Sequence, residues 1–134
     1  MEYRDILIDT NIIIDFLRKS NKQKTSLWKI KESNYNSIIS TITVFELYAG
    51  ATSERHTDDL KRLIKWLEIQ PLTASIAQLS AEIYKDLKAH NQLIEFRDIF
   101  IGATAIKLNI PLLTLNDKHF VRIKGIRLYD RKTI

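Results

Sequence analysis

The chain has 134 residues, a formal net charge of +5 at pH 7, and 45% hydrophobic and 28% charged residues. This length and composition are typical of a single folded domain, which we expect to span residues 1–134. The lack of cysteine excludes disulfides, thiolate catalysis and Cys-based zinc sites, and the three scattered histidines lack the spacing of zinc proteases.

Short apolar runs alternate with helical patterns in the first half of the chain. In chain order they predict a strand over 6–8, helices over 12–19 and 24–32, a strand over 36–40, and a helix from Thr41 or Thr43 to about Ala51. The basic residues Arg18 and Lys19 lie near the end of the 12–19 helix, where the helix dipole favours positive charge.

The second half continues the alternation. It predicts helices over 54–68, 74–90 and 98–108, strands over 69–72, 112–115 and 126–129, and a turn or half-helix over 118–120. Strands that alternate with helices imply parallel pairing, and therefore an α/β sandwich. In such sheets ligands collect beyond the carboxyl ends of the strands.

Three carboxylates occur in unusually apolar surroundings. Asp9 ends the first strand, Glu46 is the only charged residue between Ser33 and Ser53, and Asp98 precedes an apolar, Ala-containing helix. Burying ionised carboxylates is costly unless a cation or several donors compensate, and neighbouring carboxylates repel one another. A divalent cation resolves both problems. Because the ligands are oxygens, this favours Mg²⁺ or Mn²⁺.

Each polar residue of this set also has a structural interpretation. Asp9 and Asp98 are suitable N-caps for the helices that follow them, and Glu46 suits the surface of a partly exposed helix. Asn116-Asp117 follows a strand at the same sheet edge but is also a common turn sequence. Thr10 and Asn11 lie at a helix N-terminus, where they either cap the helix or hold a phosphate.

Four motifs in order resemble those of PIN domains, and most of all the VapC toxins of type II toxin–antitoxin systems. They are Ile8-Asp9-Thr10-Asn11, Thr43-Val44-Phe45-Glu46-Leu47, Arg97-Asp98 before an Ala-rich helix, and Thr114-Leu115-Asn116 with Phe120 behind it. The resemblance extends from Ile6 to about Tyr129. It implies a PIN-like three-layer sandwich, with a central, mostly parallel sheet of four to five strands flanked by helices.

The resemblance also implies an activity and partners. These are a Mg²⁺- or Mn²⁺-dependent endoribonuclease, an RNA substrate, a VapB-type antitoxin and a homodimer. By position, Asp9, Glu46 and Asp98 match the family's three best-defined acids. The fourth position of the family pattern holds Asn116, and Asp117 follows one residue later. The sequence leaves open whether Asp117 reaches the metal directly, through water, or not at all.

These roles define a catalytic hypothesis in which a metal-bound water attacks an RNA phosphodiester in line. Asp9 and Asp98 are expected to be direct ligands, with Glu46 orienting the water or binding a second ion. Asn116 or Asp117 would complete the metal shell. Thr10, Asn11 or Asn116 would position the substrate or a phosphate oxygen. The candidates for tracking the RNA backbone are the basic residues Arg18, Lys19, Lys22, Lys24, Arg97 and Lys118.

Two other functions compete with this hypothesis. A catalytically degenerate PIN-like module would bind RNA or protein without turnover, an alternative kept open by Asn116. A phosphatase of the haloacid-dehalogenase type also places an Asp after its first strand, but it usually needs a second Asp two residues later, where this chain has Asn11.

Two further features bear on location and partners. The charged N-terminus, Met1–Asp5, is unlike a signal peptide, and no segment reaches the roughly 18 apolar residues of a membrane span, so we expect a cytoplasmic protein without membrane contact. The stripe Leu60, Leu63, Ile64 and Leu67, with Trp66 and Leu72 beside it, suits core packing, or else an antitoxin groove or dimer face.

Overall fold

A four-stranded parallel sheet forms the centre of the computed structural model, which describes residues 4–133. The strands are β1 (Arg4–Ile8), β2 (Tyr35–Ser40), β3 (Glu68–Gln70) and β4 (Leu112–Leu113), in the order β3-β2-β1-β4. In the register of the central strand, Leu7 lies between Ile38 of β2 and Leu112 of β4. All four strands therefore end at the same edge of the sheet.

Seven α-helices connect and flank the strands. They are α1 (Thr10–Arg18), α2 (Ser26–Glu32), α3 (Thr41–Ala49), α4 (Glu54–Ile64), α5 (Ala74–Ala89), α6 (Phe96–Leu108) and α7 (Asp117–Phe120), with short 3₁₀ segments at Lys22–Lys24 and Arg131–Thr133. None of the helices within residues 4–133 is both long and apolar enough to span a membrane.

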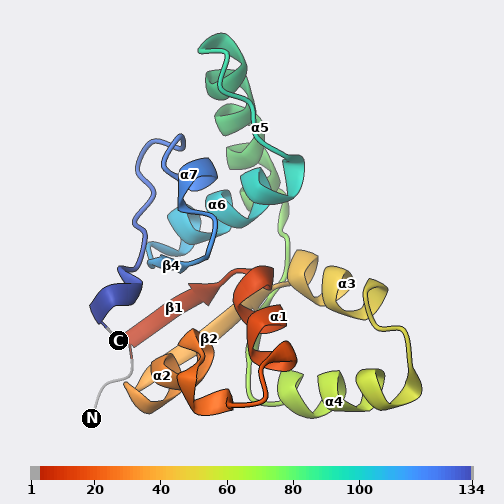
Figure 1. The fold of residues 1–134 in the computed structure, drawn as a ribbon. Coiled ribbons are helices and arrows are strands. Elements are labelled where there is room, and N and C mark those ends of the chain that lie inside the picture. The colour runs from red at the N-terminus through yellow and green to blue at the C-terminus, as the bar shows by residue number, and fades with distance from the viewer. Residues whose placement is uncertain (1–3, 134) are drawn as a thin grey trace.

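The pleat of β1 divides the core into two halves. Ile6 and Ile8 face one side of the sheet and pack with α1, α2 and α4, whereas Leu7 faces the other side and packs with α5 and α6. Side chains on both faces are fully buried, as expected for a parallel sheet covered by helices. Figure 1 shows the resulting three layers, with α1, α2 and α4 on one side of the sheet and α5 and α6 on the other. The predicted α/β sandwich is confirmed.

Several predicted boundaries were wrong. The strand expected over 126–129 is reduced to a single bridge between Leu128 and Leu112. Its neighbour β4 is only two residues long, because the chain turns toward Asp9 at Thr114, so no longer ladder can form. The helix expected over 54–68 ends at Ile64, where Trp66 and Leu67 close a turn onto β3. The helix expected from Asp98 begins two residues earlier, at Phe96.

Candidate active site

Asp9 is fixed at the carboxyl end of β1, where the strand becomes α1. Its Oδ1 atom accepts a hydrogen bond of 2.7 Å from the Thr10 amide, and its Oδ2 atom accepts one of 2.7 Å from the Thr114 hydroxyl. Asp9 is therefore the N-cap of α1, as one interpretation of the sequence predicted. The carboxylate is 0% exposed, and both of its oxygens are oriented by short contacts from neighbouring elements.

Asp98 lies in the first turn of α6 and does not cap it. The N-cap is Glu95, whose side chain makes no capping hydrogen bond, so the capping interpretation of Asp98 was wrong. The Asp98 carboxylate is buried and lies 3.0 Å from Nδ1 of His119. Burial raises the pKa of Asp98, and His119 and Arg97 oppose this shift only in part. A cation at Asp98 would therefore relieve a desolvation penalty.

Glu46 projects from α3 and is half-buried. Its Oε1 atom lies 2.7 Å from the hydroxyl of Thr10, and that hydroxyl lies 2.9 Å from Oγ1 of the buried Thr43. These contacts join α3 to the start of α1, and they hold the Glu46 carboxylate on the Asp9 side of the site.

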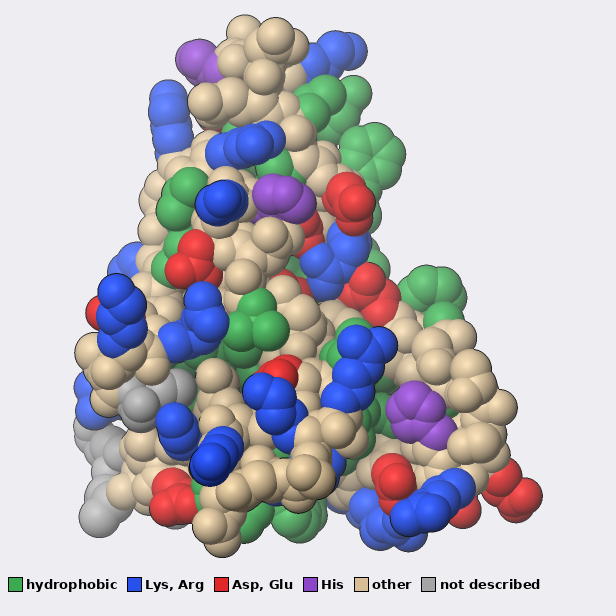
Figure 2. All heavy atoms as spheres, in the orientation of Figure 1, with side chains coloured by type: hydrophobic (Ala, Val, Ile, Leu, Met, Phe, Trp, Pro, Cys, Tyr) green, Lys and Arg blue, Asp and Glu red, His purple; other side chains and the backbone are tan. Residues whose placement is uncertain are grey.

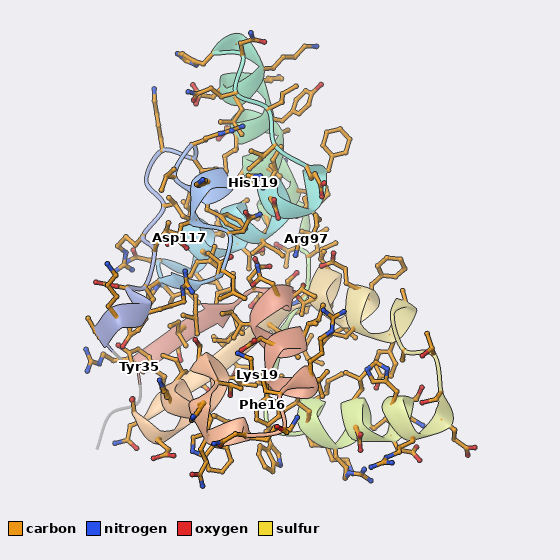
Figure 3. All side chains as sticks on the ribbon, viewed as in Figure 1. Phe16, Lys19, Tyr35, Arg97, Asp117 and His119 are labelled. Atoms are coloured by element: carbon orange, nitrogen blue, oxygen red, sulfur yellow. The ribbon has the colours of Figure 1, made fainter. Side chains whose placement is uncertain are left out.

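The side chain of Arg97 brings the three acids together. Its Nε donates to Glu46 Oε2 at 2.7 Å, its Nη2 donates to Asp9 Oδ1 at 2.8 Å, and its Nη1 donates to Asp98 Oδ1. Nη2 also lies 3.0 Å from Glu46 Oε1. Burial lowers the pKa of Arg97, but the hydrogen bond to Glu46 and the negative charges of Asp9 and Asp98 raise it overall, so the guanidinium is permanently charged. Figure 3 shows Arg97 where α6 meets α1 and α3.

The donor set suits a hard divalent cation. Within residues 4–133, no three Asp, Glu or His side chains are placed to hold a metal ion as they stand, since Arg97 lies between the acids. The three carboxylates nevertheless supply oxygen ligands from three elements around one positively charged group, at the sheet edge where α/β proteins bind ligands. The oxygen chemistry of these three side chains is compatible with a divalent cation, and the binding of Mg²⁺ or Mn²⁺ by Asp9, Glu46 and Asp98 stays a prediction.

The segment after β4 contributes to the site in a way that the sequence did not predict. Asn116 Nδ2 lies 2.7 Å from Nδ1 of His119, and the same ring nitrogen lies 3.0 Å from Asp98 Oδ2. If Nδ1 carries a proton it donates to Asp98, whereas an unprotonated Nδ1 accepts from the Asn116 amide instead. Asn116 therefore reaches the acids through His119.

Asp117 is not brought into the cluster. Its carboxylate is exposed at the start of α7 and lies 4.0 Å from Nη2 of Arg131. Figure 3 shows it on the α7 side, apart from Arg97. That Asp117 is a catalytic or metal-binding residue stays a prediction.

Thr10 and Asn11 differ in what they contact. Thr10 touches Glu46 and Arg97, so it belongs to the site. The Asn11 amide oxygen accepts from the Leu115 backbone N–H at 3.2 Å, and its nitrogen lies 3.5 Å from Thr114 Oγ1. Asn11 thus fastens the loop after β4 to α1. A phosphate-positioning role for either residue stays a prediction.

Three supporting residues escaped prediction: His119, Thr43 and Thr114. Thr43 and Thr114 were named only as members of the PIN-like motifs, and His119 only as one of three scattered histidines. The available signal was their place beside predicted acids: Thr43 is one turn before Glu46, and Thr114 ends a strand at the same edge as Asp9.

A hollow of about 370 Å³ opens beside Glu46, between α1, α3 and α4. Its lining includes the apolar residues Ile14 and Leu17 and the basic residues Arg18 and Arg55. Of the three acids of the cluster, Glu46 lines this hollow, where it lies with Arg18, Arg55 and a second acid, Asp59.

Comparison with known proteins places this geometry in a family. A family model described as "PIN domain" matches residues 6–126. The chain is 32% identical over 132 residues to Ribonuclease VapC1 of Methanocaldococcus jannaschii, covering 97% of this chain and 90% of that protein. It is 34% identical over 133 residues to Ribonuclease VapC of Rickettsia bellii, covering 92% and 93%.

Solved structures agree. The fold matches DNA-bound VapBC from Salmonella typhimurium with a TM-score of 0.84 and 26% identity, covering 96% of this chain and 98% of that one. It matches VapBC2 from Rickettsia felis, bound to a promoter DNA fragment, with a TM-score of 0.83 and 26% identity, covering 93% and 97%. The chain belongs to the PIN domain family and, within it, to the group of VapC proteins.

Proposed function

We propose that this chain is a Mg²⁺- or Mn²⁺-dependent endoribonuclease and the toxin of a VapBC-type toxin–antitoxin pair, acting in the cytoplasm. One observation carries the proposal: Asp9, Glu46 and Asp98, from three separate elements, all contact the same cationic group at the carboxyl edge of a parallel sheet. The names of its relatives, Ribonuclease VapC1 and Ribonuclease VapC, support the reaction class.

The three acids would hold the metal ion. When bound, such an ion supplies a water of lowered pKa as nucleophile and neutralises charge that develops on the phosphate. The chain's own residues orient the ligands. Thr114 and the Thr10 amide fix the two oxygens of Asp9, and the Thr10 hydroxyl fixes Glu46. His119, in turn, holds the second oxygen of Asp98.

The RNA path runs along the groove beside Glu46. Arg18 and Arg55 line this groove and would pair with phosphates of the RNA. Lys and Arg side chains are spread over the face shown in Figure 2, consistent with the net charge of +5. Single-stranded RNA, whose backbone bends to follow a surface, is the substrate form that this shallow site favours.

The antitoxin partner fits a second, apolar groove between α1, α2 and α4. It is lined by Phe16, Leu27, Trp28, Leu63, Trp66 and Leu67, together with the stems of Lys31 and Glu32. Trp66 is 60% exposed, although it is large and apolar. The structures of relatives were solved as VapBC toxin–antitoxin complexes, which supports a VapB-type protein as the occupant. The homodimer implied by the family resemblance is part of the same proposal.

The function is tested by incubating the purified chain with fluorescently labelled RNA in Mn²⁺ and in EDTA. We expect cleavage in Mn²⁺ only, and none by Asp9→Asn. Asp86→Asn is the matched control, because Asp86 lies on α5 and contacts His90 and Lys124 outside the site. Binding of RNA without cleavage by the unmodified chain would favour a degenerate binding module instead.

The same preparation tests the phosphatase alternative. In the structure, the position that would need a second Asp holds Asn11, whose amide is engaged with the loop after β4. We expect no hydrolysis of phosphomonoesters and no covalent aspartyl adduct in the presence of a fluoride analogue. Trapping such an adduct on Asp9 would overturn the nuclease proposal.

A further inference from the structure

The oxygens that converge in the site are the ones held by Arg97. Arg97 contacts Oδ1 of Asp9, Oδ1 of Asp98 and both oxygens of Glu46. The remaining oxygens are committed elsewhere: Asp9 Oδ2 to Thr114, and Asp98 Oδ2 to His119. A metal ion that bound the oxygens contacted by Arg97 would compete directly with the guanidinium.

We propose that Arg97 is a built-in counter-cation that partly compensates the charge of the acids in the metal-free enzyme and must withdraw when the metal ion binds. The inference rests on the proposed function for the identity of the metal site. It adds that metal binding is an exchange of one cation for another, and that this chain's own residue sets the affinity.

Charge and hydrogen bonding both favour the guanidinium of Arg97 between the three acids. Its planar fork matches carboxylates far better than a lysine does, and charge-assisted bonds of this kind are about twice as strong as neutral ones. One guanidinium leaves two of the three negative charges uncompensated, so the cluster still attracts a divalent cation. A divalent ion brings twice the charge to the same oxygens and can displace the guanidinium.

Arg97 is also placed so that it can leave. It lies in the first turn of α6, so its backbone is fixed by the helix, while its side chain is 25% exposed. By contrast, Asp9 and Asp98 are almost completely buried. The exchange would therefore take place by rotation of one long side chain, and it would free a guanidinium next to Glu46.

The test is Mn²⁺ affinity measured by calorimetry and by the electron paramagnetic resonance signal of free Mn²⁺, in the absence of RNA. Arg97→Gln removes the competing charge, so we expect Mn²⁺ to bind at least about tenfold more tightly than to the unmodified chain. Arg97→Lys keeps the charge but loses the fork, and should fall between the two. Arg62→Gln is the matched control, since Arg62 pairs with Asp59 on the surface of α4.

Stability gives a second readout. In EDTA, Arg97→Gln should melt at a lower temperature than the unmodified chain, because the acids lose their counter-cation. Adding Mn²⁺ should raise the melting temperature of Arg97→Gln by more than it raises that of the unmodified chain. If Arg97→Gln does not fold in EDTA, the ¹⁵N–¹H signal of Arg97 Nε in the unmodified chain replaces it. We expect that signal to shift and lose its protection from exchange as Mg²⁺ is added.

The proposal is overturned if folded Arg97→Gln binds Mn²⁺ with unchanged or weaker affinity. It is also overturned if the Arg97 Nε signal does not respond to saturating Mg²⁺, or if no variant binds metal at all. These failures are distinct from failure of the proposed function. If the unmodified chain cleaves RNA but Arg97→Gln binds Mn²⁺ with unchanged affinity, only the proposed cation exchange is refuted. If Arg97→Gln binds Mn²⁺ more tightly but the unmodified chain does not cleave RNA, only the proposed nuclease function is refuted.

Discussion

At the scale of single residues, Asp98 and Asp117 make a matched pair. Both are aspartates in the first turn of a helix near the same sheet edge, but Asp98 is buried against Arg97 and His119, whereas Asp117 is exposed beside Arg131. We expect Asp98→Asn to reduce Mn²⁺-dependent RNA cleavage by more than about a hundredfold, because even outer-shell partners of a metal account for 10–100-fold. Asp117→Asn should lose less than about tenfold. Single-turnover cleavage rates measure both, and equal losses would return Asp117 to the metal site.

Asp98→Asn also makes a prediction about stability and pH. The pKa of Asp98 is raised by burial, so the folded chain binds a proton there more readily than the unfolded chain, whose value is near 3.8. This contribution to stability is fully present below the unfolded pKa and is lost as pH rises through the folded pKa. In EDTA at pH 7, Asp98→Asn should therefore be at least as stable as the unmodified chain, with its advantage shrinking toward pH 4. Urea unfolding at both pH values checks the sign.

Substitution of Thr114 tests whether its hydrogen bond orients the Asp9 carboxylate. Its hydroxyl donates to Asp9 Oδ2 at 2.7 Å and accepts from the Asn116 N–H at 2.9 Å, and the residue is 1% exposed. Thr114→Val keeps the shape but leaves both partners unsatisfied. We expect a loss of about 1–3 kcal/mol in the free energy of unfolding and of about 10–100-fold in cleavage. Full activity in a chain destabilised by that amount would show that Asp9 does not need the hydrogen bond from Thr114 for catalysis.

At the scale of elements, α4 and the turn after it contain one residue that packs in the core and one that is exposed for partner binding. Leu60 is completely buried on its inner side, whereas Trp66, just after the helix, is exposed in the apolar groove formed with α1 and α2. Leu60→Ala should cost about 2–5 kcal/mol of stability. Trp66→Ala should change stability by less than about 1 kcal/mol and weaken VapB-type antitoxin binding by at least about tenfold. Unfolding curves and titration with a co-expressed antitoxin distinguish these outcomes, and unaltered antitoxin affinity would place the partner elsewhere.

The elements that could be predicted from the sequence are those with a local pattern. The apolar run Ile6–Ile8 and the periodicity of residues 74–90 identified β1 and α5 closely, because burial of one face leaves a repeat along the chain. The last strand, at 126–129, was overestimated because strand length depends on the partner, and β4 offers only two residues. No local pattern contains that information.

The same distinction applies to the site. Asp9, Glu46 and Asp98 were found because charge in apolar surroundings is visible in the sequence. Arg97 was recognised only as part of a motif and a basic surface, because its contacts with Asp9 and Glu46 join residues 88 and 51 positions apart. His119 meets Asp98 only because α7 folds back onto α6, which no spacing predicts.

At the scale of the whole molecule, the net charge of +5 surrounds an acidic centre, so RNA binding and catalysis make opposite demands. The acids repel phosphate, and the basic residues of the surface have to overcome this before the metal site can act. Binding should therefore depend strongly on salt, because each phosphate contacted releases counterions.

We expect the logarithm of the RNA association constant of Asp98→Asn, which binds without cleaving, to fall linearly with the logarithm of salt concentration. Two to four phosphate contacts along the groove would give a slope of about −1.4 to −2.8 for single-stranded RNA. Adding Arg18→Gln should reduce the steepness by about 0.7, since Arg18 lines the groove and its loss removes one phosphate contact. Lys132→Gln, in the C-terminal 3₁₀ segment, is the control of equal charge and should leave the slope unchanged. Fluorescence anisotropy between 50 and about 300 mM KCl measures the slopes, and equal effects of the two substitutions would mean that RNA responds to overall charge and follows no defined path beside Glu46.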